Sequence, residues 1–203
     1  MQSDFVASTR KTVFSIRKIA KYIKNSTQAT EKLQQFQAAH QGTYRDQSSP
    51  PPLFTVTLDV ATRWNSTYDM LAKFSKYKPS IVAFLNYLKT SEGRSEFRGK
   101  KLPSVTEKEW SIIDGLCLLL KPFYDATNLL SGEKYSTLIV AFSLLRAVES
   151  YLSNRNMFIS NSEGKQKFRQ FRDKYEDETY YEKLVTELDA CRGVLLESFK
   201  KRF

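Results

Sequence analysis

The chain has 203 residues, 41% of them hydrophobic and 13% aromatic, which allows a buried core and excludes wholesale disorder. With only 7 glycines and 6 prolines, long helices are favoured over a many-turned β fold. A net charge of +10 predicts an acidic partner, nucleic acid first and an anionic membrane surface second, although a basic balance can also serve solubility alone.

The first predicted element is a basic amphipathic helix over residues 8–24. Apolar residues recur there at helical spacing: Val13, Phe14, Ile16, Ile19, Ala20 and Ile23. Cations occupy much of the remaining surface: Arg10, Lys11, Arg17, Lys18, Lys21 and Lys24. Two interpretations stay open, a solvated surface face and a face that contacts phosphates, and a membrane-surface role has weaker support.

A second helix should begin at a Ser26 cap and run to Ala39, before a polar, proline-ended loop at 42–52. Residues 53–58 carry the best strand pattern, since they are rich in β-branched and aromatic residues and alternate in polarity. A lone strand is not stable in water, and the rest of the chain offers almost no partner. This orphan strand therefore belongs to a larger sheet or pairs locally in an unusual way.

Helical patterns return after Asp59, with a helix that Asn65 or Ser66 should cap and Pro79 should restart. Its apolar stripe is Tyr68, Leu71, Phe74, Tyr77, Ile81, Phe84, Leu85 and Leu88. Residues 90–103 are polar and contain glycine, which predicts a mobile loop.

The C-terminal half predicts three long helices. Thr106 and Glu109 form a capping box ahead of the first, which Pro122 should kink. Residues 137–152 predict a second and residues 180–203 a third. The inward residues of the third are Leu184, Leu188, Cys191, Leu195 and Leu196. The expected fold class is mostly α, a helical bundle with one orphan strand.

Two cysteines and one histidine leave little room for metal or thiol chemistry. Cys117 and Cys191 lie in apolar helical patterns and are expected to be buried, and no flanking signature supports a nucleophilic pair with His40. No Cys/His group has zinc spacing, so neither a metal nor another cofactor is expected. Without a membrane-length run or a signal-peptide core, an intracellular protein with no membrane partner is expected.

Two ordered blocks resemble those of hAT-family DNA transposases. The first, at 58–71, contains the string TRWNST, and the second, at 102–135, contains LKPFYDATNLLSG. Residues 15–26 are similar to the helix that precedes the first block in the family. The resemblance covers most of residues 13–152 and is loose beyond them.

The resemblance implies a position inside a larger enzyme, whose RNase H-like core holds divalent metal with two Asp and one Glu and is interrupted by a helical insertion domain. Residues 1–59 would be the C-terminal edge of that core, two helices and a strand. Residues 60–203 would be part of the insertion domain. The catalytic Asp residues are expected upstream of Met1 and the catalytic Glu downstream of Phe203, so this chain should hold no catalytic residue and no metal site.

The resemblance transfers a role to Arg63 and Trp64. In the family this pair lies near the active site, and the Trp is associated with stabilising a flipped base, whose lost stacking an aromatic face can replace. Alternatively, Trp64 is a core residue that anchors the strand-to-helix turn. The predicted DNA-binding set is completed by four cations of the basic helix: Arg17, Lys18, Lys21 and Lys24.

Two hypotheses of different class stay open. In the first, the chain is a catalytically incomplete, nuclear remnant of a transposase that binds DNA at transposon ends or serves as a scaffold. In the second, it is a helical protein-interaction module domesticated from a transposase, whose exposed apolar surface binds another copy of itself or the missing transposase core. A stand-alone enzyme has no supporting constellation, because Asp114 and Asp125 fit a solvated helix face better than a metal site.

Overall fold

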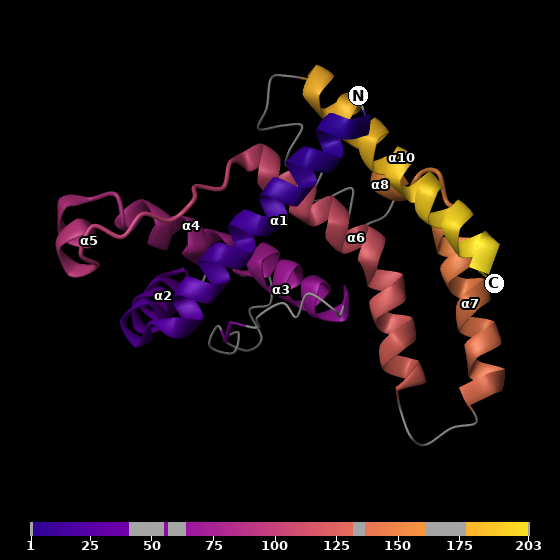
Figure 1. Ribbon diagram of the computed structural model, residues 1–203, viewed down its shortest axis with the longest axis horizontal. Helices are drawn as coiled ribbons and strands as arrows, with labels where there is room; N and C mark the ends of the chain where they lie inside the picture. The colour runs from indigo at the N-terminus through magenta and orange to yellow at the C-terminus, as the bar shows by residue number, and fades with distance from the viewer. Residues whose placement is uncertain (1, 41–54, 57–63, 132–136, 161–177, 203) are drawn as a thin grey trace. The chain divides into compact units, whose positions relative to one another are not determined.

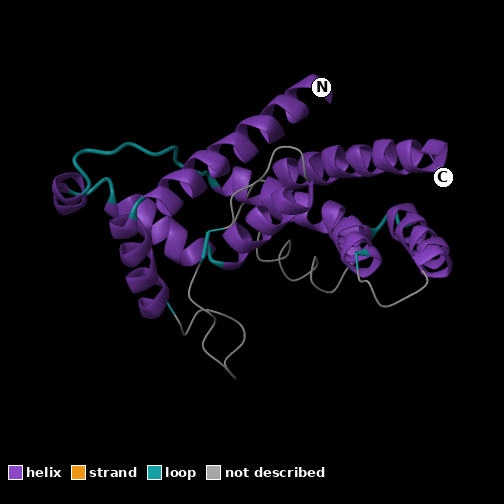
Figure 2. Cartoon of the chain, turned by 60° about the horizontal axis from the view of Figure 1, so that its bottom comes forward, coloured by secondary structure: helices purple, strands orange, loops and turns teal. Residues whose placement is uncertain are grey.

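The structure, a computed structural model, describes residues 2–40, 55–56, 64–131, 137–160 and 178–202 (Figure 1). The helices in chain order are α1 (Gln2–Asn25), α2 (Thr27–Ala39), α3 (Trp64–Lys76), α4 (Lys78–Tyr87), α5 (Ser91–Glu96), α6 (Glu107–Leu130), α7 (Thr137–Ser153), α8 (Met157–Ser160) and α10 (Glu178–Arg202). Figure 2 shows the described part drawn only as helices and loops. The mostly α fold class is confirmed.

The predicted strand at 53–58 and the loop at 42–52 lie almost wholly outside the described residues. Of the strand, only Thr55 and Val56 are described, and they belong to neither a helix nor a strand. The orphan strand and its RNase H-like assignment therefore stay predictions. The same holds for the domain boundary after Asp59, which falls inside an undescribed segment.

Contacts divide the chain into two compact units. The N-terminal unit is Val6–Ile113, and the C-terminal unit is Met1–Phe5 together with Asp114–Phe203. The division falls within α6, so this one helix contributes residues to both units.

The N-terminal unit forms around apolar faces that the sequence predicts. Ile16, Ile19 and Ile23 of α1 are fully buried, and α2 packs against α4. The Ser26 cap is confirmed, because its hydroxyl oxygen accepts a hydrogen bond of 3.2 Å from the Ala29 N–H and satisfies a donor of the first turn.

Most residues of the predicted apolar stripe on α3 and α4 are buried. Leu71, Phe74 and Ile81 are at most 1% exposed, and Pro79 lies in the first turn of α4, where its missing N–H costs nothing. The cap predicted at Asn65 or Ser66 is wrong, because α3 already begins at Trp64. The Asn65 side-chain oxygen is buried without a hydrogen-bond partner among the described residues, so it caps no N–H.

The loop predicted at 90–103 is wrong for residues 91–96, which form the helix α5, whereas residues 97–103 are turn and loop. The Thr90 hydroxyl caps this helix by accepting from the Gly93 N–H at 3.1 Å. The Glu96 carboxylate accepts from the Tyr87 hydroxyl at 2.5 Å and pairs with the Lys32 ammonium at 3.1 Å. These two partners, Tyr87 first, lower the pKa of the Glu96 carboxyl.

Glycine at position 93 permits this close packing. A methyl group there would lie 2.0 Å from the carbonyl oxygen of Tyr87, far inside van der Waals contact. Backbone must lie against backbone for α5 to fold back on the end of α4, and only glycine leaves the room.

The capping box ahead of α6 is confirmed in both directions. The Glu109 N–H donates to the Thr106 hydroxyl at 3.3 Å, and the Thr106 N–H donates to the Glu109 carboxylate at 2.8 Å. The helix continues through Pro122, which has no N–H for the Leu118 carbonyl. The Tyr151 hydroxyl of α7 donates to that carbonyl instead, at 3.2 Å.

In the C-terminal unit α7 and α10 lie side by side (Figure 1). The inward positions predicted for α10 are confirmed at Leu184 and Leu188, which are 3% and 0% exposed. Leu195 and Leu196 are half-buried. A methyl group at Gly115 of α6 would lie 2.5 Å from a Leu188 methyl, so this glycine lets Leu188 pack directly on α6.

The cysteines are less buried than predicted. Cys117 and Cys191 form no disulfide with each other, and both are half-buried rather than fully enclosed. Burial, with a smaller effect of Glu187, raises the pKa of the Cys191 thiol, which lowers its thiolate fraction at neutral pH. Every helix in the described ranges is too short or too polar to span a lipid bilayer.

Candidate nucleic-acid interface

The exposed face of α1 gathers all six cations that the sequence places between residues 8 and 24. Each is exposed: Arg10, Lys11, Arg17, Lys18, Lys21 and Lys24. Because successive helical residues turn by about 100°, these six positions fall within one arc of about 140°. The buried isoleucines occupy the opposite arc, so packing of the core side holds the cationic side outward.

This cationic face is long and free of acidic residues. The sequence from Phe5 to Asn25 contains no Asp or Glu. From Arg10 to Lys24 the face extends about 21 Å at 1.5 Å per residue, close to six base-pair rises of about 3.4 Å. Charges of one sign on one face sum to a potential that attracts a polyanion along its length.

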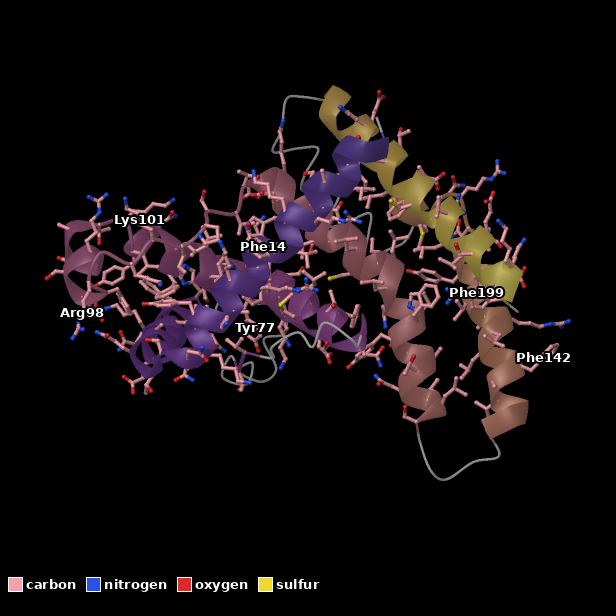
Figure 3. The ribbon with its side chains drawn as sticks, viewed as in Figure 1. Phe14, Tyr77, Arg98, Lys101, Phe142 and Phe199 are labelled. Carbon is pink, nitrogen blue, oxygen red and sulfur yellow. The ribbon has the colours of Figure 1, made fainter. Side chains whose placement is uncertain are left out.

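One aromatic ring lies within the same face and a second lies just beyond its edge. Phe14, labelled on α1 in Figure 3, is 56% exposed, and the Lys18 ammonium lies 4.6 Å from its ring centroid. Tyr22 is half-buried, and the ammonium of Lys100, from the segment after α5, lies 5.4 Å from its ring centroid. The sequence interpretation grouped Phe14 with the apolar residues and did not select Lys100. The 100° rotation already separates Phe14 from the buried isoleucines, whereas Lys100 is brought to α1 by the chain fold alone.

The structure places only some of the predicted DNA-binding residues. Arg17, Lys18, Lys21 and Lys24 share the cationic face of α1. Arg63 lies outside the described residues. Trp64 is the first residue of α3, and its side chain is outside the described part. The roles of Arg63 and Trp64 stay predictions.

No described side chains form a centre for metal chemistry. Among the described residues, no group of three or more His, Cys, Asp or Glu could hold a metal ion. Asp125 is exposed and pairs with the Lys121 ammonium at 2.7 Å, one turn away on the same helix. Asp125 therefore lies on a solvated face of α6, as the sequence predicts.

Comparison with known proteins identifies the family. The family model described as "ZBED1 RNase-like helical domain" matches residues 1–119. A Zea mays protein named as an AC transposase is 42% identical over 84 residues, which cover 40% of this chain and 9% of that protein. Zinc finger BED domain-containing protein RICESLEEPER 1 of Oryza sativa subsp. japonica is 28% identical over 151 residues, 74% of this chain and 18% of that protein.

A third relative comes from a fungus. A Talaromyces stipitatus protein named as the transcriptional regulator tpeD is 30% identical over 141 residues, 70% of this chain and 14% of its own length. The chain thus spans less than a fifth of each of these relatives. No solved structure matches it significantly. On the family match over more than half of its length, the chain belongs to the ZBED1 RNase-like helical domain family and is a hAT-transposase-derived protein.

Proposed function

We propose that this chain binds DNA through the cationic face of α1 and is a catalytically incomplete part of a transposase-derived protein. The observation that carries the proposal is the set of six exposed cations in one arc, on a helix stretch without a single acidic residue. Lys and Arg that neutralise phosphates release the counterions of DNA, which supplies binding without any demand for base contacts.

The relatives support the same direction. One is named as a transposase and another as a transcriptional regulator, two kinds of protein that work on DNA. We accordingly place the chain in the nucleus, with transposon ends as its DNA. Residues 1–59 serve as the edge of an RNase H-like core and residues 60–203 as part of its helical insertion domain. The proposal assigns none of the family's catalytic residues, two Asp and one Glu, to this chain. The function that we propose for the chain is therefore DNA binding and not DNA cleavage.

Reversing two charges on α1 should weaken DNA binding and its salt dependence. For the double variant Lys18→Glu, Lys21→Glu, we expect affinity for a plain duplex to fall at least about tenfold at low salt. The slope of log affinity against log salt should flatten by about 2, since each phosphate contact contributes about 0.9. Fluorescence anisotropy across a salt series measures both quantities.

The matched control is Lys201→Glu, Arg202→Glu at the exposed end of α10, which changes the net charge equally in the C-terminal unit. It should keep the wild-type slope. An unchanged slope in the Lys18, Lys21 variant, or an equal change in the control, would mean that α1 is not the binding face.

Replacing Trp64 should remove a preference for hairpin-ended DNA. The full chain is expected to bind a hairpin-ended duplex more tightly than a plain one, and Trp64→Ala should reduce this preference about tenfold. The reason is that stacking one unpaired base on an aromatic ring contributes about 1–3 kcal/mol. Trp64→Phe retains a ring and should keep most of the preference. If Trp64 instead anchors the core, Trp64→Ala will lower the melting temperature and leave the hairpin preference unchanged, which contradicts the proposed role.

A second candidate function, a protein-interaction module, has one observation in its favour. Phe142, Leu129 and Val194 of the C-terminal unit are 61%, 59% and 52% exposed, and Figure 3 shows Phe142 pointing away from α7. A partner here would be a second copy of the chain or the remainder of a transposase core. Concentration-dependent association in sizing experiments favours this candidate, and a clean monomer counts against self-association.

A further inference from the structure

Four residues of α1 form a single row in which cations and aromatic rings alternate: Arg10, Phe14, Lys18 and Tyr22. Residues four apart lie on one ridge of a helix, about 6 Å further along the axis and about 40° further around it. The Lys18 ammonium lies 4.6 Å from the Phe14 ring centroid, so these two members of the row are in contact. Lys100 continues the pattern from another segment, 5.4 Å from the Tyr22 ring centroid.

A second row beside it carries only cations. Arg17, Lys21 and Lys24 are exposed, and the helical rotation places all three within about 40° of Arg10. Arg17 and Lys24 lie on the side away from Tyr22, and Lys21 lies between Arg10 and Phe14. The two rows run together along the helix. One presents positive charge alone, and the other presents rings between charges.

Phe14 is the member that a phosphate-binding face does not need. A phenyl ring adds nothing to the attraction of phosphates, and leaving it 56% exposed keeps apolar surface in water. Single exposed apolar residues are common, but this ring lies inside the cationic arc. Proteins that bind single-stranded nucleic acid combine these two features, a positive track for the backbone and aromatic rings on which bases stack.

Resting on the proposed function, we propose that α1 binds single-stranded DNA, with the Arg17, Lys21 and Lys24 row along the phosphates and an unpaired base stacked on Phe14. Duplex DNA cannot stack a base on the Phe14 ring, because the bases of a duplex are stacked on one another and present only their edges in the grooves. Tyr22 lies about 12 Å from Phe14 along the axis, the rise of three to four stacked nucleotides at about 3.4 Å each, and offers a second ring.

The test compares Phe14→Ala with the wild-type chain on three probes. These are an oligothymidylate of about 15 nucleotides, an abasic oligomer with the same number of phosphates, and a duplex of equal length. We expect Phe14→Ala to bind the oligothymidylate about tenfold more weakly and to bind the other two within about twofold of wild type. The salt slope should not change, since no charge is removed. Phe14→Tyr retains a ring and should bind nearly as the wild type does.

The chain offers a matched control in Phe142→Ala. Phe142 is 61% exposed and has a cation over its ring as Phe14 does, with the Arg146 guanidinium 4.9 Å from the centroid, but α7 has no cationic row. This variant should bind all three probes as the wild type does. Wild-type affinity of Phe14→Ala for the oligothymidylate overturns the proposal, and so does an equal loss on the abasic oligomer, which carries no bases to stack. The proposed function fails separately, if Lys18→Glu, Lys21→Glu leaves binding of every probe unchanged.

Discussion

Replacing Trp110 with alanine should lower the free energy of unfolding by about 3–5 kcal/mol, the range for truncating a buried aromatic side chain. Trp110 follows the capping box of α6 and is 1% exposed, among the largest fully buried side chains of the chain. The Lys78 ammonium, paired with Glu107, lies 5.6 Å from the ring centroid. Alanine would lose the buried apolar area and leave a cavity beneath this pair.

The milder variant Trp110→Phe separates packing from hydrogen bonding. The indole Nε1 is buried without a hydrogen-bond partner among the described residues, so phenylalanine breaks no hydrogen bond and removes an unsatisfied donor. We expect Trp110→Phe to lower the free energy of unfolding by about 1–2 kcal/mol. Urea unfolding followed by far-UV circular dichroism measures both variants, because tryptophan fluorescence changes with the substitution itself. A loss below about 1 kcal/mol for Trp110→Ala would contradict the core role of this residue.

Replacing Arg192 with leucine should destabilise the C-terminal unit by about 2–3 kcal/mol. The Arg192 side chain is 6% exposed, and its Nη1 donates to the Leu152 carbonyl of α7 at 2.5 Å. That carbonyl belongs to the last turn of α7, where no intrahelical donor remains, and Leu152 itself is fully buried. Leucine would fill part of the space and leave a buried acceptor without its charged donor.

Asp189→Asn is the control for the ion-pair part of this contact. Asp189 is 38% exposed and binds the Arg192 Nε at 2.6 Å, and asparagine keeps an acceptor in the same place. A partly exposed pair contributes at most about 1 kcal/mol, so this variant should cost much less than Arg192→Leu. Thermal and urea unfolding of the two variants side by side measures the difference. Equal losses would show that the ion pair, and not the bond to the α7 carbonyl, holds Arg192 in place.

Fold class, most helix ranges and family were accessible from the sequence because the relevant signals are local. The Ser26 cap and the box of Thr106 and Glu109 join groups three residues apart, so they act wherever the helix later packs. The apolar faces of α1, α3 and α4 were predicted from helical spacing for the same reason. The hAT-like blocks are continuous strings of residues, and the family match over residues 1–119 agrees with them.

Only the tertiary structure decided the features that depend on residues distant in the sequence, which are the helix at residues 91–96 and the burial or exposure of charged side chains. The segment at 90–103 reads as polar loop, yet α5 forms there because Lys32 and Tyr87 reach Glu96 from other helices. Arg192 is polar in sequence, and its burial follows from a carbonyl 40 residues away. The cations of α1 were named from the sequence, but their exposure depended on which face of the helix the core covered. Hydrogen bonds between near neighbours are set by the order of residues, whereas burial is set by which faces meet, and this second property is not local.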